Sequence, residues 1–497
     1  MIKYTSTKQL SIEEFKTPFY YGLDKNNRWS RLASQIPWDD FAMIYAKALC
    51  EDFGRPALDA RIVIGALIIK HKKGLSDEET IEEIKENPYL QYFIGYEEFS
   101  HKPPFDPSLF VTLRDRLGID AFESLNQAFI EGVRKSEEKS PSPKKKSNSK
   151  DDTDSGDPSP EEPDRQGKLI LDASVAPQDI KFPTDLDLLN DAREHTERII
   201  DELWEPVPGK RKPRTYRRIA RNDYLSVVKL KKKSAKVLRT SIRKQLNYNR
   251  RNIRTIKKML NPELGKPLPL SHRDLRTFWI VEEIYRQQKQ MYDRKVHSVS
   301  DRIVSIAQPY VRPIVRGKSK NHTEFGAKIS ASLVDGYVFL DHLSWDAFNE
   351  GTDLVTQVER YKHRFGYYPE AVIADTIYGT QKNRKYLRGL GIEFSGKALG
   401  RPPKLTEQEA KMARNKHKAQ ARLRNGIEGK FGEGKRKYDL DLVKAKTMNT
   451  SESWIAAVFF VMNLARWLRM SSFLSLFRWL ENFKERLLYK PKMALSC

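Results

Sequence analysis

The chain has 497 residues and a formal net charge of +24, so it can form two or three domains and is expected to meet a polyanion, either nucleic acid or an anionic membrane surface. The longest apolar run, Trp454–Leu464, falls short of the ~18–20 residues that span a bilayer, and Met1–Leu10 lacks the apolar region of a signal peptide. Two cysteines, Cys50 and Cys497, exclude a disulfide framework and a cysteine-rich zinc site, which together predicts a reduced, cytoplasmic, nucleoid-associated protein that binds no membrane.

Residues 1–135 have the pattern of an all-helical N-terminal domain. Four helices are indicated by apolar periodicity, a capping box or an Asp-Pro start, at Leu58–Lys70, from Ser76–Glu79, from Asp106-Pro107 and at Ile119–Arg134. Gly74 ends the first of them and Pro88 lies beyond the second. Such a bundle is typical of a helix-turn-helix-like domain that recognises DNA ends, and it is equally typical of an ordinary helical scaffold.

A linker is predicted at 136–166. This stretch has no apolar residue, is rich in Ser, Pro and charge, and contains the run Lys144-Lys145-Lys146. It cannot bury enough surface to offset the entropy of an ordered chain, so we expect disorder. A long structured loop is the alternative, although such loops are uncommon in compact domains.

Residues 167–475 alternate between strands and helices. Strands are predicted at Lys168–Ala173, Phe325–Leu333, Tyr337–Leu343, Ala371–Asp375 and Ile392–Phe394, and helices at Asp353–Phe365, Thr380–Leu390, from Thr406 through Glu428, and at Trp454–Leu468. Asp335-Gly336 is a two-residue hairpin turn between two of the strands. This order predicts an α/β fold in which helices pack on a mixed sheet, followed by a C-terminal tail at 476–497.

One block interrupts that alternation. Residues 188–319 are mainly helical, and within them Pro208–Leu260 contains 20 Lys and Arg against the single acid Asp223. Tyr216, Tyr224 and Tyr248 are interleaved with these cations. A solvated charged face is one interpretation. The density of charge favours a phosphate-contacting surface, for which we nominate Arg217, Arg218, Lys231, Lys232, Lys233, Arg250 and Arg251.

Two carboxylates follow predicted strands. Asp172 comes after Leu-Ile-Leu and Asp375 after Val-Ile-Ala, so both are expected at the carboxyl edge of the sheet, where ligands bind in open α/β folds. A single aspartate at a strand end is usually a turn or a helix cap. The pair becomes a candidate catalytic site only with a third ligand.

Glu428 is the candidate third ligand. On a helical projection Arg424 and Lys435 fall within about 60° of each other with Glu428 between them, provided that the helix is not interrupted. An exposed ion-pair stripe is the alternative. Glycines at 426, 429, 432 and 434 argue against it, because each costs a helix about 1 kcal/mol.

Three carboxylates suit two Mg²⁺ ions, or Mn²⁺ in their place, which together activate water and stabilise the leaving oxygen of a phosphodiester. Arg424 and Lys435 would hold phosphate. The chain has no glycine-rich phosphate loop of the Gly-x4-Gly-Lys-Ser/Thr type and no His-Glu-x2-His motif, which disfavours a nucleotide cofactor and zinc chemistry.

These residues resemble the DDE transposases of bacterial insertion sequences, most closely the group numbered five and its relatives. The resemblance rests on the order Asp172, Asp375, Glu428 and on the pattern Arg-x3-Glu-x6-Lys from Arg424 to Lys435. Further similar stretches are Leu171–Ile180, Gln308–Lys318, Glu324–Lys328 and Ala374–Gly379, and Tyr20–Gly118 is similar to the helical N-terminal domain of that group. One departure is Ala421, where the related signature has tyrosine.

The resemblance implies a ribonuclease H-like core, Mg²⁺ dependence, a metal triad of Asp172, Asp375 and Glu428, and a phosphate-binding role for Arg424 and Lys435. It also implies binding to the terminal inverted repeats of an element, cleavage, and joining of 3′-OH ends to target DNA. Two element ends must be brought together, so a homodimer on double-stranded DNA is expected. A ribonuclease H-like nuclease that does not join DNA, and a transposon-derived DNA-binding protein without activity, are the alternatives.

Overall fold

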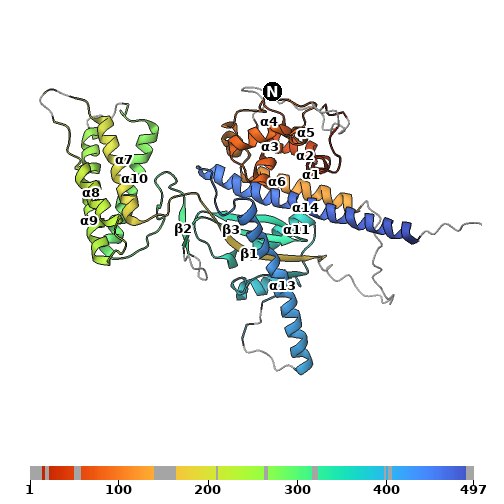
Figure 1. The fold of residues 1–497 in the computed structure, drawn as a ribbon. Helices are drawn as coiled ribbons and strands as arrows, with labels where there is room; N and C mark the ends of the chain where they lie inside the picture. Colours follow the sequence, from red (N-terminus) through yellow and green to blue (C-terminus); the bar gives the residue numbers. More distant parts are fainter. Residues whose placement is uncertain are drawn as a thin grey trace, which may run out of the picture.

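The computed structural model of this chain describes residues 14–16, 22–49, 57–138, 164–206, 208, 211–261, 267–315, 323–396, 399–400 and 406–488. It is a mixed α/β structure with one six-stranded sheet and many helices (Figure 1). The predicted linker falls mainly on 139–163, which lie outside the described residues, so its disorder stays a prediction.

The N-terminal part is helical, as the sequence predicts. Its helices are α1 (Arg28–Gln35), α2 (Trp38–Lys47), α3 (Ala60–Lys73), α4 (Asp77–Glu86), α5 (Pro88–Phe93) and α6 (Leu109–Glu138). Gly74 ends α3 in the left-handed region at φ +69°, and the capping box at Ser76 and Glu79 is formed. Non-helical Gly118 divides α6 where the sequence indicates two helices.

The sheet has the order β2-β3-β1-β5-β6. Its strands are β1 (Lys168–Pro177), β2 (Arg312–Val315), β3 (Thr323–Val334), β4 (Tyr337–Ser344), β5 (Ala371–Ile373) and β6 (Glu393–Phe394). β1 is antiparallel to β3 and parallel to β5, and β4 pairs with the edge of β3 away from β1. The β3–β4 hairpin turns at Asp335 (φ 49°) and Gly336 (φ 80°), which confirms the predicted two-residue turn.

The remaining helices of this part also follow the predicted order. They are the 3₁₀ turns η2 (Glu350–Thr352) and η3 (Thr376–Tyr378), and the helices α11 (Leu354–Phe365), α12 (Gln381–Gly389), α13 (Glu407–Lys437) and α14 (Met448–Leu488). α14 continues well beyond the predicted helix at Trp454–Leu468, and so runs into the segment that the sequence analysis assigned to a tail.

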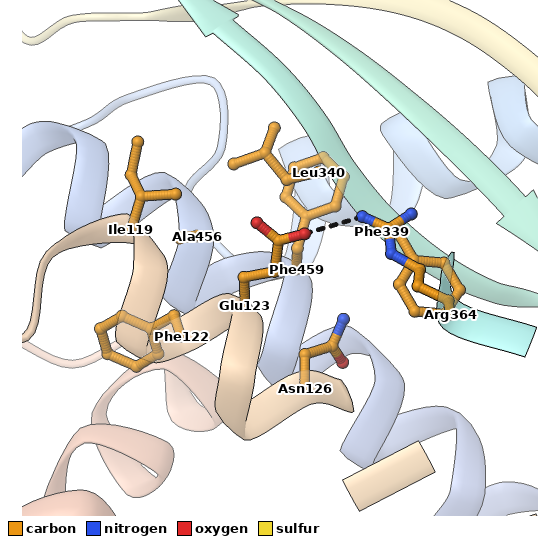
Figure 2. A pocket seen from close by; sticks show the side chains of 9 residues that line it. All are labelled: Ile119, Phe122, Glu123, Asn126, Phe339, Leu340, Arg364, Ala456 and Phe459. Carbon is orange, nitrogen blue, oxygen red and sulfur yellow. Dashed lines mark hydrogen bonds and ion pairs between the residues drawn. The ribbon is translucent and has the colours of Figure 1, made fainter. Parts of the chain in front are cut away.

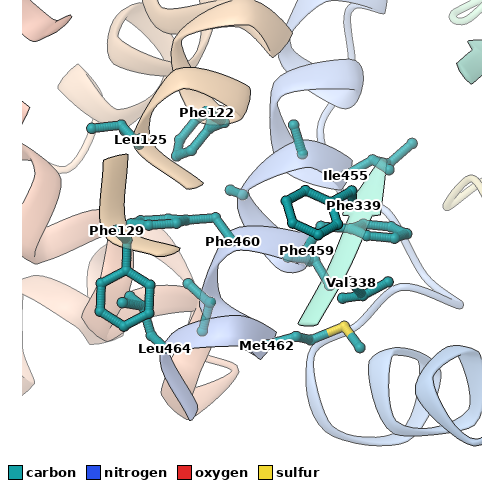
Figure 3. Close-up of a cluster of buried hydrophobic side chains, with 14 of the residues drawn as sticks. Phe122, Leu125, Phe129, Val338, Phe339, Ile455, Phe459, Phe460, Met462 and Leu464 are labelled. Atoms are coloured by element: carbon teal, nitrogen blue, oxygen red, sulfur yellow. The ribbon is translucent and has the colours of Figure 1, made fainter. Parts of the chain in front are cut away.

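A single hydrophobic core joins the N-terminal helices to the sheet. Figure 3 shows Phe122 and Phe129 of α6 facing Phe460 of α14, with Phe339 of β4 on the far side of α14. Burial of each such phenylalanine contributes about 1.5–3 kcal/mol. No helix within the described ranges is long and apolar enough to cross a membrane.

Asn463 interrupts the apolar run of α14 for a structural reason. It is fully buried and binds the backbone of Val338 in β4 twice, accepting from its N–H at 2.9 Å and donating to its carbonyl at 2.7 Å. Its amide also donates to Asn126 of α6 at 2.8 Å. One buried amide therefore fixes α6, β4 and α14 relative to one another.

A second polar link lies beside a small cavity of about 10 Å³, room for about one water molecule (Figure 2). Arg364 of α11 is buried there, with Nη1 2.7 Å from Oδ1 of Asp341 in β4 and Nη2 2.9 Å from Oε1 of Glu123 in α6. This cavity is too small and too enclosed by core residues to take a substrate, so it belongs to the packing between the parts.

The predicted helical block at 188–319 forms a bundle beside the β2 edge of the sheet (Figure 1). It contains α7 (Asp185–Leu203), α8 (Arg217–Val228), α9 (Ala235–Leu260) and α10 (His272–Arg294). The bundle has hydrophobic clusters of its own, in which Ile199, Ile256 and Val281 are fully buried. It is therefore held together by its own core as an insertion between β1 and β2.

Candidate active site

Asp172 and Asp375 come to the same end of two adjacent parallel strands. Ile170 of β1 pairs with Ile373 of β5, and each aspartate follows its paired residue by two positions. Neighbouring strands are about 4.8 Å apart. The predicted proximity of the two carboxylates is therefore set by strand register.

The structure corrects one detail of that prediction. β1 does not end at the predicted Ala173 but continues to Pro177, and its residues Ile170–Pro177 pair with β3. It is β5 that ends, at Ile373, so that among the described strands the other edge of β1 has no partner from Leu171 onward. The carboxyl edge at Asp172 thus arises because its neighbour is short.

Glu428 comes to this edge on α13. The helix is continuous through all four glycines to Lys437, so the one-face arrangement of Arg424, Glu428 and Lys435 holds. α13 packs on β1, β3 and β5, and its buried residues are Ile427, Lys430, Phe431 and Gly434. The third predicted carboxylate therefore stands next to the two strands that carry the others.

Arg424 connects the carboxylates directly. Its Nη1 lies 3.3 Å from Oδ1 of Asp375, and its Nη2 lies 3.3 Å from Oε1 of Glu428. The side chains of Asp375 and Glu428 are 39% and 51% exposed, so the site is open to a large substrate. One guanidinium thus balances two carboxylates that would otherwise repel each other.

Asp172 is partly buried, and its pKa is raised from 3.8 to about 6. Burial is the largest cause, and the negative charges of Glu350 and Glu428 add to it. A hydrogen bond from the Ala173 N–H, at 2.9 Å, and the charge of Arg424 act in the opposite direction. A cation near Asp172 would relieve this accumulation of negative charge.

Glu350 is a fourth acidic residue at the site that the sequence analysis did not identify. It lies in η2, and its Oε1 is 2.9 Å from Nζ of Lys328 in β3. Asn383 of α12 holds η2 against η3 by donating to the Gly351 carbonyl at 2.6 Å and to the Tyr378 carbonyl at 2.8 Å. Only this packing brings Glu350 near Asp172, and no periodicity or motif signals it.

Lys435 stands apart from the three carboxylates. Seven residues, or about 10 Å of helix, separate it from Glu428, and its Nζ is 3.8 Å from Oε1 of Glu324 in β3. Arg424 is therefore in contact with the carboxylate group, whereas Lys435 extends the same face further along α13.

The carboxylate group has the donor chemistry for a hard divalent cation but is not a closed metal cage. Among the described residues, no three His, Cys, Asp or Glu side chains are placed so that they could hold a metal ion. Arg424 now stands between Asp375 and Glu428. Oxygen ligands together with the raised pKa of Asp172 nevertheless fit a site that gains from a cation.

The basic residues predicted in the insertion divide into two kinds. Arg217 is paired with Asp201 at 2.8 Å, and the guanidinium of Arg251 lies 4.3 Å from the ring centre of Tyr216. By contrast, Lys231, Lys232 and Lys233 are exposed in the loop between α8 and α9, and Arg218 and Arg250 are exposed on helices. The second kind can meet phosphate without breaking a contact within the bundle.

The bundle has a cationic hollow that the sequence does not predict. It has a volume of about 550 Å³, between α9 and α10, and Arg250, Arg254, Lys257 and Lys258 line it together with Glu282.

The interleaved tyrosines form hydrogen bonds within the bundle. Tyr248 donates to Asp223 at 2.8 Å, and Tyr224 donates to Asp187.

Comparison with known proteins gives two family matches and one relative. A family model described as "Transposase DDE domain" matches residues 372–465, and one described as "Transposase domain (DUF772)" matches residues 18–116. The relative, "Uncharacterized protein ORF8 in nfe locus" of Rhizobium meliloti, is 34% identical over 155 residues, which are 31% of this chain and 64% of that protein. No solved structure matches.

Proposed function

We propose that this chain, which is similar to DDE transposases, acts on the ends of an insertion sequence. It binds the terminal inverted repeats, cleaves DNA there and joins the 3′-OH ends to target DNA. Two transposase family models match it in the expected order, one over the N-terminal helices and one over a segment that contains Asp375, Arg424, Glu428 and Lys435. The resemblance predicted from the sequence is thereby confirmed.

In this proposal Asp172, Asp375 and Glu428 hold Mg²⁺, for which Mn²⁺ can substitute. The bound metal would supply an activated water and charge stabilisation at the phosphodiester. Arg424 and Lys435 would bind phosphate on either side of Glu428, and Arg424, which now pairs with Asp375 and Glu428, would exchange these carboxylates for phosphate in the loaded site. No protein nucleophile and no nucleotide cofactor is needed.

The observation that carries the proposal is the convergence of three carboxylates from distant positions. Register places Asp172 beside Asp375, and Arg424 joins Asp375 to Glu428 at 3.3 Å. Three separate elements, β1, the end of β5 and α13, meet at this point. A surface ion pair needs no such convergence, whereas a two-metal site does.

The surrounding fold supports the same function. A mixed sheet with carboxylates on adjacent parallel strands supports the predicted ribonuclease H-like core. The exposed lysines of the insertion and the net charge of +24 support binding to long double-stranded DNA. We propose a homodimer in the DNA complex, because two element ends have to be joined in one reaction.

The test compares Asp375→Asn with a matched control, Asp346→Asn. Asp346 is also an exposed aspartate, but it pairs with Arg312 at 3.5 Å and lies outside the carboxylate group. Each protein is incubated with Mg²⁺, a duplex that carries the element end, and a supercoiled plasmid. Asp375→Asn should bind the duplex but neither cleave nor join it, and Asp346→Asn should behave as wild type.

Other results would point elsewhere. Retained cleavage by Asp375→Asn would rule out the proposed triad. Cleavage without joining by the wild-type protein would support a nuclease, and binding without cleavage would support a non-catalytic DNA-binding protein.

A further inference from the structure

The first half of α13 projects from the body of the molecule (Figure 1). Every buried residue of the helix lies in its second half, from Ile427 onward, and residues 411–419 are all exposed. A helical segment of this length is only marginally stable in water without a partner. The chain therefore maintains an exposed helix that leads directly to Arg424 and Glu428.

One side of this projecting segment faces the sheet. Nζ of Lys416 lies 2.9 Å from Oε2 of Glu393 in β6, and Nε2 of Gln420 donates to Oε1 of the same residue at 2.7 Å. These two contacts fix the rotation of the helix. The opposite side of α13 is turned away from the sheet.

That opposite side carries a row of cations. The stretch 411–422 contains five Lys or Arg and no acid. At 100° per residue, seven exposed positions between 411 and 436 share a face of about 80°, centred opposite Lys416 and Gln420. We call it the α13 cationic face, and its members are Lys411, Arg414, Lys418, Arg422, Asn425, Gly429 and Arg436.

Packing within the chain explains Gly426 and Gly434 of α13, but it does not explain Gly429. A Cβ at Gly434 would lie 2.9 Å from Cδ2 of Leu440, and one at Gly426 would lie 3.2 Å from Cδ2 of Leu333, so packing within the chain explains both. A Cβ at Gly429 would meet nothing within 4 Å. No neighbour within the described part of the chain thus requires glycine at 429, although it costs the helix about 1 kcal/mol.

We propose that the α13 cationic face is a docking surface for the sugar-phosphate backbone of a DNA duplex that leads to the active site. The proposal deepens the proposed function and rests on it. From Lys411 to Arg436 the face is about 37 Å long, the length of roughly 11 base pairs. Gly429 is one residue from Glu428 and has no side chain, so the sugar-phosphate backbone of the duplex can approach the helix where the scissile phosphate has to arrive.

The positive charge of the α13 cationic face favours a polyanion over a protein as its partner. Five of the seven members are cations for which the described residues provide no ion-pair partner: Lys411, Arg414, Lys418, Arg422 and Arg436. A second copy of this strongly basic chain would be repelled by such a row. A duplex would release counterions along the same row and gain affinity.

The test compares two lysines two residues apart on the same helix. Lys418 is on the α13 cationic face, whereas Lys416 is on the side bound to Glu393. Binding of the full-length Lys418→Gln and Lys416→Gln proteins to a labelled duplex of about 40 base pairs is measured over a range of KCl concentrations, without Mg²⁺. Lys418→Gln should reduce the slope of log K against log salt by about 0.9, and Lys416→Gln should leave it at the wild-type value.

A second pair tests close approach independently of charge. Gly429→Gln adds a side chain on the face and favours the helix, so it should retain or raise the melting temperature while weakening duplex binding at least fivefold. Ala413→Gln places the same side chain on the same helix, away from the face, and should bind as wild type.

Equal slopes for the two lysine variants, together with wild-type binding by Gly429→Gln, would overturn the docking surface. A change in oligomeric state of Lys418→Gln with an unchanged slope would overturn it in favour of a subunit contact. Cleavage with Mg²⁺ is scored separately on the wild-type protein. A failed docking surface with intact cleavage is therefore distinguishable from a failed transposase.

Discussion

Lowering the pH tests the carboxylate group through Asp172. Its pKa is raised to about 6 by burial and by the charges of Glu350 and Glu428, against the hydrogen bond from Ala173 and the charge of Arg424. A raised pKa means that the folded, metal-free protein prefers the neutral carboxyl. Its contribution to stability is therefore present below about pH 4 and is lost as the pH rises through about 6.

The effect on metal affinity follows from the same pKa. With a pKa of about 6, roughly one Asp172 in eleven is ionised at pH 5, and nearly all are ionised at pH 7.5. Metal binds the ionised form. Between these pH values the contribution of Asp172 should therefore weaken Mn²⁺ binding roughly tenfold, or about 1.4 kcal/mol. An aspartate with the ordinary value of 3.8 would contribute a loss of less than about 10%.

Calorimetric titration of the protein with Mn²⁺ at both pH values measures this loss, and Glu350→Gln separates Asp172 from the other ligands. Removing the Glu350 charge lowers the pKa of Asp172, so the variant should lose less affinity at pH 5 than the wild type. A wild-type loss under twofold, or the same loss in Glu350→Gln, would refute the reasoning. The number of protons released on Mn²⁺ binding near pH 6, measured in two buffers, should also be smaller for Glu350→Gln than for the wild type.

Three further outcomes are expected. Asp77→Asn should lower the free energy of unfolding by about 3–5 kcal/mol in urea titrations, because Asp77 is the common ion-pair partner of buried Lys70 (3.0 Å) and Arg114 (2.8 Å). A loss below about 1 kcal/mol would show that other groups stabilise the charges of Lys70 and Arg114. Gly326→Ala should reduce the yield of folded protein and cost at least about 1–3 kcal/mol, since its Cβ would overlap the Ala176 carbonyl of β1, and wild-type stability would contradict the β1–β3 register. Replacing Lys231, Lys232 and Lys233 together with Gln should lower the salt slope of DNA binding by up to about 2.7, and an unchanged slope would make them a solvated face only.

Much of the fold was predictable from local signals. Ser76 and Glu79 form a capping box in three-residue spacing, and Asp335-Gly336 supplies two residues that adopt positive φ, so both features depend on neighbours in the sequence. The same holds for α13, whose start at Thr406 is fixed by its capping box with Glu409. Local chemistry determines such features wherever the segment lies in the fold.

Other features required contacts between distant segments. The sequence predicts a strand that ends at Ala173, but pairing with β3 extends it to Pro177. The interleaved tyrosines of the insertion likewise bond to acids such as Asp223 within the bundle. Exposed and paired cations have the same sequence signal, so only tertiary structure separates Lys231 from Arg217.

The sequence by itself determined which chemical groups are available to this protein: three carboxylates after strands and on a helix, two cations at fixed spacing from one of them, and a strongly basic insertion. Residue types and helical spacing are local properties, and they survive without knowledge of the fold. Tertiary structure alone decided that Glu350 lies near Asp172, that Arg424 connects Asp375 to Glu428, and that one face of α13 has no ion-pair partner within the described part of the chain. These relations depend on strand register and on the packing of α13 over the sheet, which no local pattern encodes.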